Sequence, residues 1–129
     1  MPTLSARDFI KKKNAEWTAE LGREGKRGFK DISRKGKHYF MREAWTLMPQ
    51  HNISEKVFVF ERLRRVDIIG TQTHERVKVG DIEYRFGYYI VGRIGNRKGR
   101  WTWGQYCPLI PGKDLTKLLA KAKKDGTIL

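Results

Sequence analysis

The stretch from Tyr84 to Tyr106, YRFGYYIVGRIGNRKGRWTWGQY, constrains the fold of this chain more than any other. Residues 82–94 and 100–110 each have the composition of a β-strand, because aromatic and β-branched side chains dominate them. Gly95 and Gly99 bracket the turn between the two strands. The stretch therefore predicts an antiparallel hairpin, and the rest of the fold must be built around it.

The register of this hairpin decides which side chains face solvent. A four-residue loop over 96–99 pairs Ile94 with Trp101 and Gly92 with Trp103, which gathers the apolar side chains on one face. Burial of aromatic surface favours this register, so we expect both tryptophans to lie mostly in the core. A shift by one residue instead places them among the arginines, where exposed rings would suit a cage for methylated lysine. Glycines beside the aromatic rows relieve crowding or let a ligand approach the backbone: Gly87, Gly92 and Gly104.

The opposite face of the hairpin is the candidate binding surface. Aromatic rings interleaved with guanidinium groups suit a ligand whose bases stack while its phosphates are neutralised. The net charge of +14 on 129 residues points to the same polyanionic partner, because self-repulsion of this size costs stability. The basic segment 22–37 has too few apolar side chains to fold alone, so we expect a flexible loop that joins the interface. The predicted nucleic-acid-binding residues are Arg85, Tyr89, Arg93 and Tyr106 on the hairpin face, Arg97, Lys98 and Arg100 at its tip, and Lys30, Arg34, Lys35 and Lys37 in the loop.

Helical signals occur near both ends of the sequence. Ser5 followed by Asp8 matches a capping pattern and predicts a helix that runs to about Leu21. A second helix is expected over 38–48, where apolar residues recur at helical spacing. Asp114 is expected to cap a last helix, with Gly126 beyond its end and one apolar face: Leu115, Leu118, Leu119 and Ala122.

Between these helices the pattern is that of β-strands. The segment 57–63 alternates, residues 66–69 continue it or begin another strand, and residues 76–79 form a short strand before a turn at Gly80-Asp81. The predicted fold class is α+β: a twisted antiparallel meander of about four or five strands, with N-terminal helices and a C-terminal helix on one face. A small barrel of SH3 or OB type is the alternative. We expect one domain over 1–129, with a basic helical part at 1–55, a sheet over 56–110 and a helix over 112–126.

The composition limits the partners of the chain. The single cysteine, Cys107, excludes an internal disulfide and a zinc-binding CxxC pair, and we expect it to be a buried thiol in the cytoplasm. No apolar run approaches the length needed to span a bilayer, so no membrane partner is expected. We also expect no cofactor and no metal, because the three histidines lie far apart without ligand spacing.

These patterns identify a class of partner and no reaction. The function we predict is a nucleic-acid-binding module without catalysis, in which the exposed tyrosines slightly favour single strands or flexible loops. A small nuclease acting on RNA or DNA is one alternative, with His74 or His38 as its first candidate residues, and a protein-interaction or assembly component is the other. The choice between DNA and RNA stays open.

Overall fold

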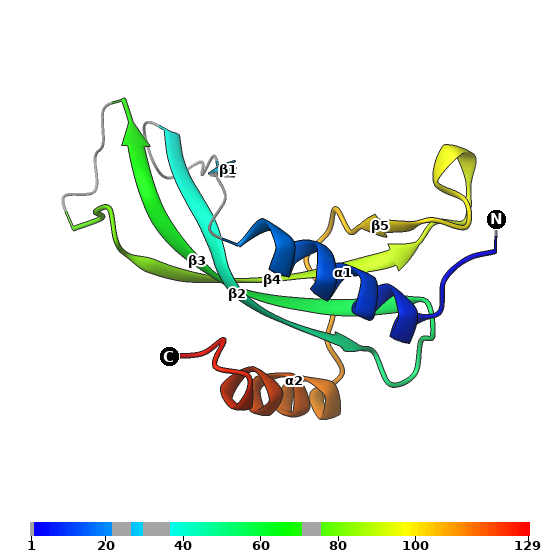
Figure 1. Ribbon diagram of the computed structural model, residues 1–129. Helices are drawn as coiled ribbons and strands as arrows, with labels where there is room; N and C mark the ends of the chain where they lie inside the picture. Colours follow the sequence, from blue (N-terminus) through cyan, green and yellow to red (C-terminus); the bar gives the residue numbers. More distant parts are fainter. Residues whose placement is uncertain (1, 22–26, 30–36, 71–75) are drawn as a thin grey trace.

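An antiparallel sheet of five strands, in the order β1-β2-β3-β4-β5, forms the centre of the molecule (Figure 1). The computed structural model describes residues 2–21, 27–29, 37–70 and 76–129. The predicted α+β meander is therefore confirmed. The strands are β1 (Arg27–Phe29), β2 (Lys37–Pro49), β3 (Lys56–Ile69), β4 (Ile82–Val91) and β5 (Trp101–Trp103); the helices are α1 (Ala6–Glu20), α2 (Gly112–Lys124) and the 3-10 turn η1 (Gly95–Arg97).

The two helices begin and end close to where their sequence signals lie. Ser5 caps α1, and its hydroxyl accepts a hydrogen bond from the Asp8 amide at 3.1 Å, as predicted. At the end of α2, Gly126 adopts a positive φ of 81°, and the Thr127 amide returns to the Ala122 carbonyl at 2.9 Å. The start of α2 differs from the prediction, because the helix begins at Gly112 and Asp114 already lies inside its first turn.

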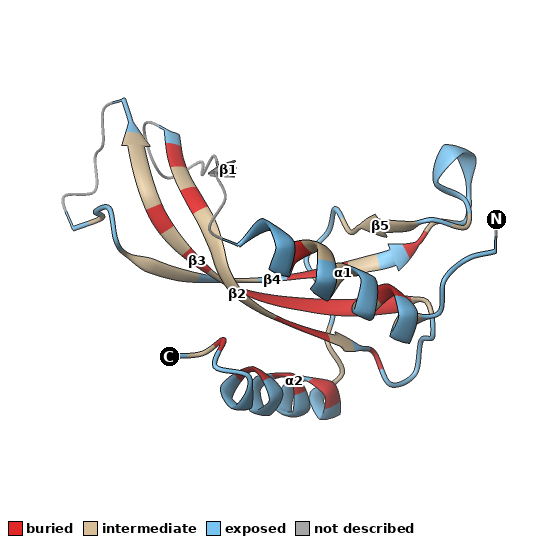
Figure 2. Ribbon diagram, viewed as in Figure 1, coloured by how far each residue is buried: buried red, intermediate tan, exposed pale blue. Residues whose placement is uncertain are grey.

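The helices cover opposite faces of the sheet, and the prediction that they share one face is wrong (Figure 1). Alternation along β3 explains the arrangement. Val57 and Val59 pack in the cluster that α1 covers, whereas Phe58 and Phe60 pack in the cluster that α2 covers. Because both faces are covered, β3 is buried without interruption from Lys56 to Glu61 (Figure 2). Where both layers of helix cover it, the central strand has no solvent face; towards Ile69 the strand becomes partly exposed.

The helix predicted over 38–48 is in fact most of strand β2. Its register with β3 shifts between Tyr39 and Phe40 and again between Arg42 and Ala44. Each irregularity breaks the simple two-residue alternation of the strand. The apolar residues consequently fall at spacings that resemble a helical face, which is why the sequence pattern was misleading.

The register of the β4–β5 hairpin also differs from the prediction. Tyr89 pairs with Trp103 and Val91 with Trp101, so β5 is displaced by three residues from the expected pairing. A displacement by an odd number of residues moves the tryptophans to the other face of the hairpin. They lie half-buried on the α1 face together with Tyr89, next to the buried Phe9. Burial did not discriminate between the registers, because both faces of the sheet are covered.

Three smaller predictions are settled by the described residues. The short strand expected over 76–79 is absent there, since the chain turns at Gly80, whose φ is 98°. Cys107 is exposed, so the prediction of a buried thiol is wrong. Residues 66–69 continue β3.

Among the described helices, none has the length and apolar character required to cross a membrane.

Candidate functional site

The loop that connects β4 to β5 is rich in basic residues and projects from the sheet (Figure 1). We call residues 92–100 the tip loop. The Gly92 amide donates to the Arg100 carbonyl at 3.0 Å, and the Gly99 amide donates to the Gly92 carbonyl at 2.9 Å, which closes the loop on itself. Gly95 and Gly99 adopt positive φ values of 62° and 75°, a conformation that other residues rarely tolerate. The folded loop displays four exposed cations: Arg93, Arg97, Lys98 and Arg100.

One side of the tip loop contains a hollow of about 330 Å³ that we call the outer hollow. Arg93, Arg97 and Tyr106 line it, so the structure brings three of the predicted binding residues together. Tyr106 is 81% exposed, which leaves its ring accessible for stacking. Arg93 forms one exposed ion pair, with Glu55 at 3.3 Å, and such a pair has little stability of its own.

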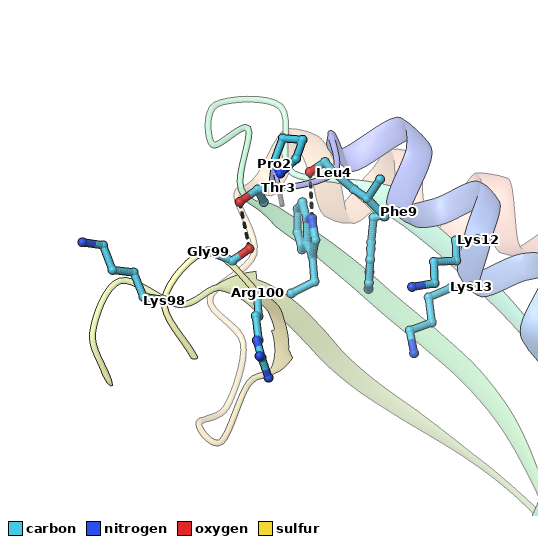
Figure 3. Close-up of a pocket in the computed structure, with 10 residues that line it drawn as sticks. Pro2, Thr3, Leu4, Phe9, Lys12, Lys13, Lys98, Gly99 and Arg100 are labelled. Carbon is cyan, nitrogen blue, oxygen red and sulfur yellow. Dashed lines mark hydrogen bonds between the residues drawn. The ribbon is translucent and has the colours of Figure 1, made fainter. Parts of the chain in front are cut away.

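A larger hollow, of about 530 Å³, lies between α1 and the tip loop (Figure 3). We call it the α1 hollow. Lys12 and Lys13 from α1 line it, as do Lys98 and Arg100 from the tip loop, and none of its ten lining residues is acidic. Figure 3 shows Lys12 and Lys13 on one side and Arg100 on the other, while Lys98 extends outward at the rim. Sequence reasoning found the two tip cations but did not connect them with the helix lysines.

Stacked aromatic rings connect α1 with the tip loop. The rings of Phe9 and Trp101 lie parallel, with centroids 4.6 Å apart and an angle of 14° between their planes. Both residues line the α1 hollow. One helical turn after Phe9, Lys13 lies on the same side of α1, and its ammonium is 5.9 Å from the Phe9 ring centroid. The four-residue spacing of Phe9 and Lys13 was therefore the signal in the sequence that both lie on one side of a helix. It points to the α1 hollow only once the contact between Phe9 and Trp101 is known.

The segment before α1 closes one end of this hollow. The Thr3 hydroxyl donates to the Gly99 carbonyl at 2.8 Å, and the Trp101 indole N–H donates to the Leu4 carbonyl at 2.9 Å (Figure 3). Thr3, Leu4 and Trp101 also line a separate neighbouring hollow of about 540 Å³. These three residues therefore lie at the boundary between the two spaces.

The cations of the α1 hollow differ in how far they are neutralised. Glu16 lies 3.2 Å from the Lys13 ammonium and 4.0 Å from that of Lys12, in exposed pairs along the helix. In the part of the chain that the structure describes, neither Lys98 nor Arg100 forms an ion pair. The hollow thus keeps a surplus of positive charge, most of it on the side of the tip loop.

Two predicted interface residues lie elsewhere than expected. Tyr89 is half-buried on the α1 face, where its ring centroid is 5.0 Å from that of Phe9 and 5.1 Å from that of Trp103. Arg85 donates from Nε to Glu61 at 2.7 Å and lies 5.0 Å from the Trp103 ring. Arg85 faces Glu61 across the β3–β4 pairing, and α1 covers Tyr89, so we remove both from the candidate interface.

Lys37, the one described residue among the predicted loop cations, does not share a surface with the hairpin tip. Lys37 begins β2 and pairs with Ile69, whereas the hairpin tip follows the end of β4 that pairs with Lys56. Lys37 is therefore at the opposite end of the sheet, where its ammonium lies 5.5 Å from the Tyr39 ring. The other predicted loop residues, Lys30, Arg34 and Lys35, lie outside the described residues.

A histidine that the sequence did not single out is held by a buried carboxylate. His51, in the turn after β2, places Nδ1 2.9 Å from the Asp114 Oδ2, and its backbone amide donates to the same oxygen at 3.0 Å. Burial raises the pKa of Asp114, but the two hydrogen bonds from His51, together with the charges of His51 and Lys117, outweigh it, and the pKa of this carboxyl lies below its ordinary value. The His51 ring is 38% exposed, so its second nitrogen is available to solvent.

The structure gives less support to His38 and His74, the two histidines that the sequence suggested as first candidates for a nuclease site. His38 is buried in β2, with 2% of its surface exposed, and His74 lies outside the described residues. The described residues contain no group of three or more His, Cys, Asp or Glu side chains arranged to hold a metal ion.

Comparison with known proteins gives no relative for this chain. No protein-family model matches it, and neither does any curated protein or solved structure that was searched. The fold and the tip loop therefore define the candidate site without help from a relative.

Proposed function

We propose that this protein is a nucleic-acid-binding module whose interface is the hairpin tip. The observation that carries the proposal is the α1 hollow, in which four cations from two distant segments line a space with an aromatic wall and no acidic residue. Lysine and arginine neutralise phosphates and release counterions, while aromatic and apolar surface accepts sugars and bases. The proposed interface comprises Lys12, Lys13, Arg93, Arg97, Lys98, Arg100 and Tyr106.

The net charge supports the same partner. The chain carries +14, and the tip loop concentrates four cations on nine residues. Clustered charge of one sign raises the local concentration of a polyanion and speeds its association. The exposed ring of Tyr106 beside Arg93 and Arg97 supports single strands over a smooth duplex, because unpaired bases are free to stack. The exposed free thiol of Cys107 suits a reducing compartment, and we propose the cytoplasm.

The proposal is tested by the salt dependence of binding to fluorescent single-stranded DNA and RNA. The double variant Arg97→Ala/Arg100→Ala should weaken binding and flatten the plot of log affinity against log salt by about 1.4 units, since each lost phosphate contact removes about 0.7. The matched control is Lys123→Ala/Lys124→Ala, which removes the same charge at the far end of α2 and should change the slope little. Equal effects of the two double variants would mean that net charge alone governs binding.

A nuclease is the second candidate, because of the His51–Asp114 pair. A buried carboxylate that holds one imidazole nitrogen leaves the other free to act as a general base or acid. Glu55 in the same turn is paired with Arg93 of the tip loop, so His51 lies in the turn that adjoins the proposed interface. Wild-type protein that cleaves oligonucleotides, with cleavage but not binding lost in His51→Gln, would favour this candidate. Absence of cleavage by the wild type would eliminate it.

The protein-interaction alternative finds less support. A cage for methylated lysine requires open tryptophan rings. One face of the Trp101 ring is stacked on Phe9, and its indole N–H is bonded to Leu4. Trp103 contacts the Tyr89 ring and the Arg85 guanidinium.

A further inference from the structure

We propose that the α1 hollow binds the terminal phosphate of a single-stranded nucleic acid, so that the module recognises strand ends. This inference rests on the proposed function and specifies its ligand. Three properties of the α1 hollow carry it: its size, its charge and the wall that closes one end.

The size of the hollow suits one small group. Its volume of about 530 Å³ lies within the roughly 300–1,000 Å³ that is usual for sites of single small ligands. A terminal nucleotide with its phosphate fits such a space, and the half-buried Trp101 ring offers apolar surface to its sugar. The remainder of the strand then continues outward along the tip loop.

The charge of the hollow suits a phosphate monoester. A terminal phosphate carries about −1.5 to −2 charges at neutral pH, whereas a phosphodiester within a strand carries one. Lys12 and Arg100 face the hollow from opposite sides and supply donors from two directions (Figure 3). Convergent cations stabilise the more highly charged group more strongly, and a monoester also presents three terminal oxygens to them.

The wall of the hollow distinguishes an end from the interior of a strand. A strand bound through its middle must leave the site in two directions, whereas a strand end needs one entrance. Thr3 and Leu4 are fixed across one end by the hydrogen bonds to Gly99 and from Trp101. Because these residues line both the α1 hollow and its neighbour, a strand that continued on that side would have to pass the bonded Thr3 and Leu4.

The test compares oligonucleotides that differ only in a terminal phosphate. Single-stranded oligonucleotides of one sequence would carry a 5′-phosphate, a 3′-phosphate or only hydroxyl ends, with the fluorophore on the opposite end. We expect one phosphorylated form to bind about tenfold more tightly than the hydroxyl form, which corresponds to one additional charge-assisted contact. Lys12→Ala/Arg100→Ala should abolish this preference. The control Arg93→Ala/Arg97→Ala, in the outer hollow, should weaken all three forms equally and preserve the preference.

The outcomes separate this inference from the proposed function. Salt-dependent binding of all three oligonucleotides with equal affinity would overturn the inference and leave the nucleic-acid module standing. No binding of any oligonucleotide would overturn both. Adenosine monophosphate is the further probe: displacement of the phosphorylated oligonucleotide at a similar concentration would identify a free nucleotide as the ligand and overturn recognition of strand ends.

Discussion

The two faces of the sheet are built from different chemistry, although one strand supplies both. On the α2 face, Phe58 and Phe60 pack with the buried Leu118 of α2 in an apolar layer. On the α1 face, the same strand places Glu61 at 0% exposure, where its two oxygens accept from Arg42 and Arg85, each at 2.7 Å. Both faces carry ion pairs, but the Glu61 carboxylate of the α1 face is fully buried, whereas Glu43 of the α2 face, paired with Arg62 and Arg64, is partly exposed.

The difference shows which face positions the candidate site. The Arg42 guanidinium lies 3.7 Å from the Trp17 ring centroid and that of Arg85 lies 5.0 Å from the Trp103 ring, so the Glu61 ion pairs connect α1 with β5. The Phe9–Trp101 stack continues this connection to the tip loop. The α2 face instead ends in polar contacts between Thr46 and Thr127, whose hydroxyls are 2.9 Å apart. The α1 face thus holds the helix and the tip loop in the arrangement that forms the α1 hollow.

The largest effect is expected from breaking the Glu61 ion pairs. Glu61→Gln removes the charge that compensates two arginines and should lower the free energy of unfolding by about 3 kcal/mol, at the lower end for buried pairs because Arg85 is partly exposed. Urea denaturation followed by far-UV circular dichroism measures this loss. Glu16→Gln is the control, because it removes two ion pairs of a solvent-accessible carboxylate on α1 and should cost less than about 1 kcal/mol. Equal losses would refute the role of Glu61.

Alanine substitution at either of two glycines should disturb one face of the sheet at a time, with a smaller loss of stability than Glu61→Gln. A methyl group on Gly87 would lie 2.3 Å from the Trp103 ring on the α1 face, and one on Gly104 would lie 2.1 Å from the Tyr88 ring, which packs on the α2 face. Each alanine substitution should cost about 1–3 kcal/mol through overpacking. Displacement of Trp103 should change the tryptophan emission in Gly87→Ala more than in Gly104→Ala. The reverse order would contradict the packing of Trp103 over Gly87 on the α1 face.

The smallest loss of stability is expected at low pH, and it should arise from carboxyl groups on the α2 side of the sheet. Hydrogen bonding by Arg64 lowers the pKa of Glu43 against the effect of burial, and the bonds from His51 lower that of Asp114. A carboxyl with a lowered pKa stabilises the fold above its unfolded pKa, and this contribution is lost as pH falls through the folded value. Stability should therefore decrease below about pH 4, with a shallower decrease in Asp114→Asn. Thermal melts at a series of pH values measure it, and identical slopes for the two proteins would exclude Asp114.

The sequence was informative where local chemistry determines the structure. Ser5 capped its helix, Gly126 ended α2, and Gly95 and Gly99 took the positive φ values of the tip loop. Two of the three glycines beside the aromatic rows relieve crowding, since the rings of Trp103 and Tyr88 lie over Gly87 and Gly104, whereas Gly92 lies against the Arg97 carbonyl of the tip loop. Exposure of Arg97, Lys98 and Arg100 followed directly from their place in a turn.

The remaining features depend on contacts between distant segments. The irregular pairing of β2 is decided with β3, and its effect on alternation made a strand resemble a helix. The register of β5 depends on α1, because Phe9 and Trp17 supply the surface that covers the hairpin. The α1 hollow joins Lys12 with Arg100, and nothing in either segment alone indicates the other.

The exposure of Cys107 limits how copies of this protein can become linked. It is the one cysteine of the chain, and it lies in the connection between β5 and α2. Each copy can therefore form a single covalent cross-link, so oxidation stops at a pair and cannot extend into a polymer. The same stoichiometry gives one attachment point for a maleimide dye, a few residues beyond the hairpin tip and adjacent in sequence to Tyr106.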